Sequence, residues 1–263
     1  FFEAGEVLTH RFAVGHRTQG ASAQVARQWP LPRAARPAGG IVCDVGQLLR
    51  YARFQMGMGK GEDGKLLLQP DALARMHTPQ VSRWGETEQV GLSWFIDEIG
   101  GVRQLSHGGG TVGQVSLLAL YPAHHLALVV LTNADEGGDV TGAVRRWMLK
   151  QCLEIEDPEP EPIEASEQEL AAYAGSYSRP FADIELGMLG GRLIGQAIYK
   201  QGFPSPDVPP PPPPPPVSLA LYAEDRLLIT GGPMAGGRAD VIRKADGSIG
   251  WLRLGRVYRR IET

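Results

Sequence analysis

The amino-acid sequence predicts an α+β protein: an antiparallel sheet with flanking helices, followed by a small all-β, barrel-like domain. Three observations support this prediction. Between residues 90 and 132, four strand-length segments are joined by short connections, which favours antiparallel pairing. Segments before and after them carry apolar residues at helical spacing. From residue 167 onward, short strand-like segments recur at even intervals with tight turns between them.

Composition sets the class of protein. The chain has 263 residues, of which 43% are hydrophobic and 21% charged, as in an ordinary globular protein with one large or two smaller domains. A net charge of −3 favours neither nucleic acid nor an anionic membrane surface as a partner. No apolar run approaches the ~18 residues that indicate a membrane span.

Three segments are predicted to be helices. Val45–Met56 has apolar residues at helical spacing, follows Asp44 as a plausible N-cap, and ends at a glycine-rich stretch. Pro70–His77 is a second short helix with proline in its first turn. Val140–Leu153 closes the first region. Residues 1–37 show little apolar period, and we expect them to be irregular.

The predicted strands fall into two pairs. Val90–Asp97 and Val102–Ser106 should meet at Gly100-Gly101, a two-glycine hairpin signal. Gln114–Tyr121 and Leu126–Thr132 form a second hairpin around a proline turn. Their continuous apolar character predicts two strands in the interior of a sheet that is covered on both faces.

The predicted domains are residues 1–153 and 167–263, with a linker over 154–166. The stretch from residue 154 to 169 carries eight acidic residues, no basic ones and three prolines, which is typical of a stiff, solvated linker. An acidic interaction tail is the alternative.

The second domain contains seven candidate strands. They are Tyr173–Ser178, Phe181–Leu189, Arg192–Ile198, Val217–Tyr222, Arg226–Thr230, Arg238–Lys244 and Ile249–Val257. A proline run from Pro209 to Pro216 interrupts them. We expect a stiff loop insertion, with a ligand for an SH3-type domain as the alternative.

A glycine-dense motif, Ser106 to Gly113, has two interpretations. Gly108, Gly110 and Gly113 match the G-x-G-x-x-G pattern of dinucleotide sites, which requires a helix directly afterwards. A hairpin follows instead, and no helical period appears before Gly138. We therefore expect no cofactor.

The second interpretation is a resemblance. His107 to Asn133 (His-Gly-Gly at a core strand, Gly-Gln-x-Ser, a proline turn, a strand ending Leu-Thr-Asn) resembles the serine hydrolases of the class C β-lactamase and penicillin-binding-protein superfamily. The third active-site motif of that superfamily is Lys-Thr-Gly, or His-x-Gly in the esterase and D-aminopeptidase branches. Ala38–Ile41 followed by Asp44 is similar to the family's "AGG-hydrophobic … D-L" helix start, and Val90–Trp94 to its "yGLGW" strand. Leu170–Tyr177 resembles the start of the lipocalin-like barrel that follows the catalytic domain in many members.

The resemblance implies cleavage of an ester or amide, in a small molecule or a peptide, through an acyl-enzyme. It implies a catalytic role for His107, which would hydrogen-bond toward the nucleophile and add positive potential. Gly108 and Gly109 match the Thr-Gly pair of the motif. Gly110 falls where the family uses a backbone N–H as the second oxyanion donor, and the three glycines let substrate lie against the strand. A histidine beside a glycine turn can also be an ordinary surface residue.

Two motifs of the family are absent from the sequence. None of the serines is followed by lysine at the third position (S-x-x-K), and no tyrosine is followed by asparagine at the second (Y-x-N). The chain also begins at Phe1 with neither an initiator methionine nor a signal peptide. We therefore expect a fragment that lacks the N-terminal half of its catalytic domain and is inactive alone, and we assign no compartment.

Other functions stay open at this stage. The chain could be a non-catalytic module that binds peptide or cell-wall fragments, or its barrel could bind a ligand. His124-His125 lie in a turn without nearby acidic residues or cysteines in the sequence, so we expect no metal site.

Overall fold

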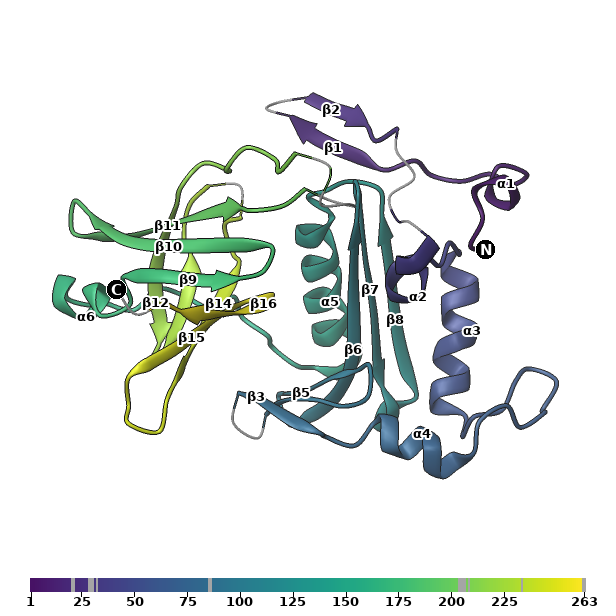
Figure 1. Ribbon diagram of the computed structural model, residues 1–263. Helices are drawn as coiled ribbons and strands as arrows, with labels where there is room; N and C mark the ends of the chain where they lie inside the picture. Colours follow the sequence, from purple (N-terminus) through teal and green to yellow (C-terminus); the bar gives the residue numbers. More distant parts are fainter. Residues whose placement is uncertain are drawn as a thin grey trace. The chain divides into compact units, whose positions relative to one another are not determined.

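The computed structural model describes residues 1–19, 22–27, 31, 33–84, 87–202, 207, 209–232 and 234–261 (Figure 1). The chain divides into two compact units, residues 1–158 and 159–263. The first unit holds an antiparallel sheet with helices, and the second holds a closed barrel. The predicted α+β fold class is therefore confirmed. The exact domain bounds predicted from the sequence remain a prediction.

In its described residues, the first unit contains one six-stranded antiparallel sheet. Its strands, in spatial order, are β3 (Val81–Trp84), β4 (Glu88–Val90), β5 (Phe95–Ile99), β6 (Val102–Thr111), β7 (Gln114–Tyr121) and β8 (Leu126–Thr132). The order in the sheet follows the order in the sequence, so every connection is a hairpin. The predicted second hairpin is confirmed by the pairing of β7 with β8. Strand β8 is however the last strand of the sheet, not an interior one.

Helices cover both faces of this sheet, as Figure 1 shows. Helix α5 (Gly137–Leu153) packs on one face, where Tyr121 meets Leu149. Helix α3 (Val45–Met56) lies on the other face, where Ala52 meets Leu118. This two-sided burial explains why β8 is apolar throughout although it is an edge strand. None of the helices in the described residues is both long and apolar enough to cross a membrane.

The predicted helix boundaries rest on caps that the structure contains. The carboxylate of Asp44 accepts a hydrogen bond from the backbone N–H of Gln47 at 2.8 Å, and the Gln47 side chain accepts one from the Asp44 N–H at 3.2 Å. This capping box satisfies two N–H groups at the start of α3. Helix α4 (Pro70–Met76) begins at its proline, as predicted.

The N-terminal region is more regular than the sequence predicts. Strands β1 (His16–Gln19) and β2 (Ser22–Val25) form a hairpin, and short helical segments occur at α1 (Ala4–Val7), η1 (Arg33–Ala35) and α2 (Arg36–Gly39). Every described side chain of β2 is exposed, so the hairpin rests on main-chain pairing and buries no apolar face. Hydrophobic periodicity therefore gave no signal for it.

The predicted strand over residues 90–97 is wrong. Strand β4 ends at Val90, β5 begins at Phe95, and a tight loop lies between them. Ser93 has a left-handed φ of 65°, and a Cβ on Gly91 would lie 2.4 Å from the Met76 carbonyl oxygen. The loop therefore depends on backbone conformations that strand propensity does not report.

The second unit is an eight-stranded closed antiparallel barrel. Its strands are β9 (Gly175–Arg179), β10 (Ala182–Leu189), β11 (Arg192–Tyr199), β12 (Val217–Ala223), β13 (Arg226–Ile229), β14 (Arg238–Arg243), β15 (Ile249–Leu254) and β16 (Arg256–Arg260). Helix α6 (Glu167–Ala171) precedes them. The predicted single strand over 249–257 is two strands, because Gly255 turns the chain with a φ of 64°. The proline run lies between β11 and β12.

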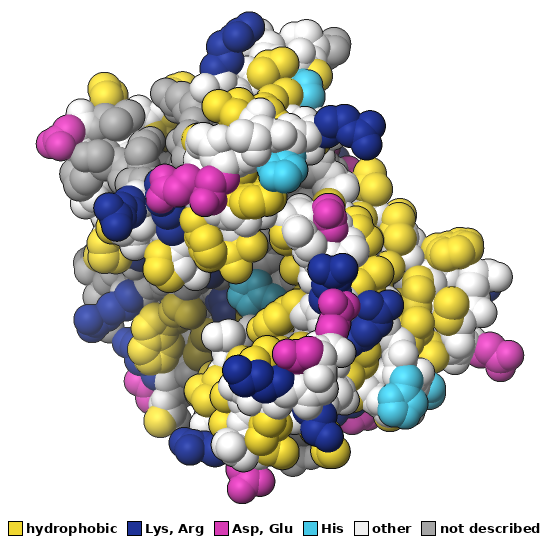
Figure 2. All heavy atoms as spheres, turned by 90° about the vertical axis from the view of Figure 1, so that its right-hand side faces the viewer, with side chains coloured by type: hydrophobic (Ala, Val, Ile, Leu, Met, Phe, Trp, Pro, Cys, Tyr) yellow, Lys and Arg dark blue, Asp and Glu magenta, His cyan; other side chains and the backbone are white. Residues whose placement is uncertain are grey.

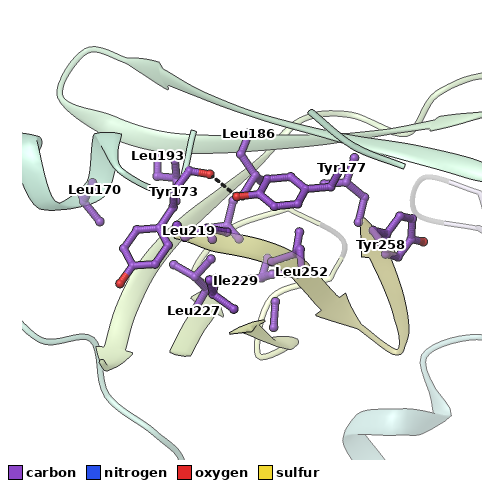
Figure 3. Packing of buried hydrophobic residues seen from close by; sticks show 14 of the residues in the cluster. Leu170, Tyr173, Tyr177, Leu186, Leu193, Leu219, Leu227, Ile229, Leu252 and Tyr258 are labelled. Atoms are coloured by element: carbon purple, nitrogen blue, oxygen red, sulfur yellow. Dashed lines mark hydrogen bonds between the residues drawn. The ribbon is translucent and has the colours of Figure 1, made fainter. Parts of the chain in front are cut away.

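Side chains fill most of the barrel (Figure 3). The Tyr177 hydroxyl, fully buried, donates a hydrogen bond to the Tyr173 carbonyl at 2.8 Å. A remaining cavity of about 50 Å³ is lined almost entirely by apolar side chains, among them Leu186 and Ile229. Small-molecule sites are commonly about 300–1,000 Å³, so this volume is too small for a ligand enclosed in the barrel.

Tyr121 couples the stability of the first unit to alkaline pH. Burial raises the pKa of this phenol to about 12, and its hydroxyl donates to the Gln104 side chain at 2.6 Å. Because the folded-state pKa lies above the unfolded value of about 10, the stabilisation is complete below pH ~10 and is lost as the pH rises toward the folded pKa. We expect Tyr121→Phe to lower the free energy of unfolding by about 1–3 kcal/mol near neutral pH. Above pH ~10 the wild type loses stability that the variant does not, so the gap in unfolding free energy between the two proteins should narrow.

Urea unfolding of both proteins across this pH range measures the gap. Tyr199→Phe, at an exposed tyrosine, is the control and should show a gap near zero throughout. A Tyr121→Phe gap that stays constant to high pH would contradict the assignment.

Candidate active site

His107 lies within a strand, not at a corner before one. The sequence predicts that β6 ends at Ser106, but the strand continues through the three glycines to Thr111 and turns at Val112-Gly113. Propensity missed this extension because glycine is a poor strand former. The cross-strand ladder to β7 keeps the segment extended. His107 and Gly108 to Gly110 are all exposed.

This part of β6 has an open edge. Strand β5 pairs with β6 only from Val102 to Ser106, where Phe95 lies opposite Ser106. From His107 onward, β6 is paired with β7 alone among the described residues. Its other edge presents backbone groups to whatever approaches.

The register decides which backbone groups face that edge. Successive N–H and C=O groups of a strand point to opposite sides. The two-residue turn at Val112-Gly113 makes Thr111 and Gln114 a hydrogen-bonded pair, so the amides of Gly109 and His107 also point toward β7. The amides of Gly108 and Gly110 therefore point toward the open edge. A Cβ added to Gly110 would have no neighbour within 4 Å. The N–H of Gly110 is therefore an accessible donor.

The imidazole of His107 stacks against an aromatic ring. Its centroid lies 5.6 Å from that of Phe95, with 23° between the ring planes. The guanidinium of Arg83 lies over the same Phe95 ring at 4.9 Å. Arg83 also donates to Asp97 at 2.7 Å and to Glu88 at 3.2 Å. Three neighbouring strands thus contribute to the surroundings of His107.

Polar side chains in the interior of the sheet adjoin the group formed by His107, Phe95 and Arg83. Desolvation raises the pKa of Asp97, while the charge of Arg83 opposes the shift. Gln104 is itself buried and accepts from the hydroxyl of Tyr121. Satisfied buried networks hold their members in one arrangement. The base of the candidate site is therefore anchored in the core of the first unit.

The tip of the β6–β7 hairpin is anchored as well. The N–H of Gly113 donates to the carboxylate of Asp135 at 2.8 Å, and its carbonyl accepts from the N–H of His16 at 3.0 Å. A Cβ on Gly15 would lie 2.3 Å from the Val112 carbonyl oxygen, so β1 docks closely against the turn. The sequence patterns described above assign no role to Asp135 or His16. Their contacts come from tertiary pairing, which no local pattern reports.

Other histidines take no part in this group. His77 is hydrogen-bonded to Gln55 at 2.9 Å, and burial lowers the pKa of its imidazole. His124 and His125 are exposed in the β7–β8 turn. In the part of the chain that the structure describes, no three His, Cys, Asp or Glu side chains gather as a metal site would require.

Figure 2 shows the molecule from the side on which α3 lies, with hydrophobic side chains exposed among charged ones. Ile41 is 63% exposed, and Val45 and Tyr51 of α3 are 42% and 41% exposed. Exposed apolar groups gathered on one face are consistent with a surface that contacts further protein.

A family model described as Beta-lactamase matches residues 2–151, more than half of the chain. The chain belongs to the β-lactamase family. This match includes the whole β6 edge. The resemblance seen in the sequence is thereby confirmed.

Individual proteins are similar to this β-lactamase-family chain over large parts of its length. Penicillin-binding protein 4 of Amycolatopsis lactamdurans is 28% identical over an alignment of 183 residues, which covers 66% of this chain and 48% of that protein. The chain thus spans about half the length of the curated relative it matches.

Two solved structures have a similar fold. The crystal structure of SurE covers 95% of this chain and 56% of its own, with a TM-score of 0.64 and 21% identity. The crystal structure of SurE with D-Leu covers 79% of this chain and 48% of its own, with a TM-score of 0.55 and 19% identity. At these identities the likeness supports the fold alone.

The register of the β6 edge is open to a direct test with proline. Gly109→Pro removes an N–H that pairs with β7, whereas Gly110→Pro removes one that faces the open edge. We expect Gly109→Pro to lower the free energy of unfolding by about 1–3 kcal/mol more than Gly110→Pro. Both prolines follow a glycine, so the restriction on the preceding residue is matched. Urea unfolding measures the difference.

Gly109→Ala and Gly110→Ala are the controls and are subtracted from the proline variants, since an added Cβ lies 2.6 Å from the Ser116 Oγ at position 109 and meets open space at position 110. Equal losses for the two proline variants, or a larger loss for Gly110→Pro, would show that the assumed register is wrong.

Proposed function

We propose that this chain is the C-terminal part of a β-lactamase-like serine hydrolase that cleaves an ester or amide bond through an acyl-enzyme. In this proposal the edge of β6 is one wall of the active site. The observation that carries it is that, in a chain of the β-lactamase family, the exposed His107 and the accessible N–H of Gly110 lie on the same open strand edge.

The chemistry requires groups that this chain does not supply. A serine oxygen attacks the substrate carbonyl carbon, the bond to the leaving oxygen or nitrogen breaks as that atom takes up a proton, and water then cleaves the acyl-serine. The proposed serine and its base belong to an S-x-x-K motif, which is absent from these residues. The parent protein is thus the proposed enzyme, and we expect the chain alone to be inactive.

Two roles fall to the β6 edge in this proposal. The N–H of Gly110 donates to the oxyanion that develops on the carbonyl oxygen, and a backbone donor fixed in a strand costs no reorganisation. His107 hydrogen-bonds toward the serine oxygen or the leaving group and supplies positive potential when protonated. An extended substrate lies along Gly108 to Gly110 and pairs with their outward backbone groups.

The substrate class proposed is an ester or amide of a small molecule or peptide. Histidine in place of lysine in the third motif tilts the proposal toward an esterase or D-aminopeptidase. Because a solved structure of similar fold contains D-Leu, D-amino-acid esters and amides belong among the substrates to test. A non-catalytic module that binds such a peptide is the competing proposal.

The test uses the full natural protein that contains this chain. We expect His107→Ala to lower kcat/KM on a substrate that the protein turns over by about 100-fold or more. His124→Ala, at an exposed histidine in the β7–β8 turn, is the matched control and should leave kcat/KM unchanged. Unchanged kcat/KM in His107→Ala would remove the role given to His107. Retention of a peptide with no turnover would favour the binding module.

A further inference from the structure

The side chain of His107 has few restraints from its own strand. The next three residues are glycines, so no neighbouring side chain on β6 limits rotation of the imidazole in that direction. On the β5 side the pairing has already ended at Ser106. In the described residues, no hydrogen bond or ion pair holds the His107 side chain. A catalytic imidazole needs a defined orientation, so a restraint must come from elsewhere.

We propose that Phe95 and Arg83 are positioning residues that orient the imidazole of His107 at the open edge of β6. This inference rests on the function proposed above and adds to it residues that act through His107. The ring of Phe95, at the start of β5, stacks on the imidazole with centroids 5.6 Å apart. Stacking of two planar rings favours a restricted set of orientations over free rotation.

Phe95 is held in turn by a charged group. The Arg83 guanidinium lies 4.9 Å from the centre of its ring, a cation–π contact. Arg83 is itself fixed by Asp97 and Glu88, at 2.7 and 3.2 Å, and all three side chains are less than a third exposed. Arg83 is on β3, Glu88 on β4 and Asp97 on β5. We call Arg83, Glu88 and Asp97 the clamp, because together they fix the Phe95 ring against His107 from three neighbouring strands.

The clamp is also connected to the core. Asp97 lies opposite Gln104 of β6 in the β5–β6 ladder, and Gln104 accepts a hydrogen bond from the buried hydroxyl of Tyr121 on β7. A chain of contacts thus runs from the middle of the sheet to the imidazole. Loss of Phe95 removes the final link and leaves the rest of the network in place.

The experiment is NMR of this chain with labelled histidine and phenylalanine rings, which requires no catalysis. The His107 ring signals are assigned by their loss in His107→Ala. We expect ring-to-ring NOEs between His107 and Phe95, and in Phe95→Leu a lower order parameter of the His107 ring with a shift of its ring protons. Phe95→Tyr keeps the ring and should restore both. Arg83→Gln should lower the order of the Phe95 ring.

Phe181→Leu is the matched control. Phe181 also lies under an arginine, Arg179 at 5.8 Å, but in the barrel. We expect it to leave the His107 signals unchanged. If the order and shifts of the His107 ring are the same in Phe95→Leu as in wild type, while the other signals remain dispersed, the positioning role is overturned.

Kinetics of the full natural protein separate this inference from the proposed function. With both correct, Phe95→Leu lowers kcat/KM by up to about 100-fold, and Phe95→Tyr recovers most of it. Loss in His107→Ala with none in Phe95→Leu overturns the positioning role alone. Loss in neither overturns the proposed function, and the NMR result then still decides whether Phe95 orients the ring.

Discussion

The unequal lengths of β5 and β6 determine the geometry of the candidate site. The two-glycine turn at Gly100-Gly101 pairs Ile99 with Val102, so β5 runs out of residues at Phe95, opposite Ser106. Strand β7 continues the ladder on the other side, which keeps β6 extended as far as Thr111. One edge of a central strand thus remains unpaired over a short span. The exposed donors and the ring contact of His107 both follow from this mismatch.

Both ends of the exposed span are anchored, although the span itself carries almost no side chains. At one end, the hydrogen bond between the buried side chains of Tyr121 and Gln104 fixes the register in the core. At the other end, Asp135 and His16 hold the hairpin tip through backbone hydrogen bonds. Preorganised backbone dipoles are effective only where the chain cannot relax away from its partner. The exposed span of β6 is therefore held rigid by the contacts at its two ends.

Local rules predicted those parts of the structure that local interactions determine. The Asp44 cap of α3, the β7–β8 hairpin and most barrel strands follow from capping, turn and periodicity signals. The β1–β2 hairpin and strands β3 and β4 are short, and those of their side chains that the structure describes are exposed or half-buried, so periodicity could not find them. The loop at Ser93 needs a left-handed φ that the family's glycine pattern could have flagged.

The candidate site was only partly accessible from the sequence. The resemblance located His107 and the three glycines, but propensity placed them at a corner instead of within β6. The register set by Gly100-Gly101 places Phe95 opposite Ser106, but successive side chains alternate between the faces of a sheet, so the contact of Phe95 with His107 did not follow from the sequence. The contribution of Arg83 did not either, since it depends on a short strand that no pattern revealed.

An unpaired strand edge without side chains also favours association between molecules. Proteins usually protect such edges with lysine, proline or a bulge, because a free edge is a template for pairing with another chain. Gly108 to Gly110 offer none of these guards, so a second molecule can add a strand there as readily as the proposed substrate can. The shortness of the unpaired span limits such association, because only two residues present outward amides before the chain turns at Gly113. The short span to which we assign substrate binding thus also keeps edge-to-edge assembly weak.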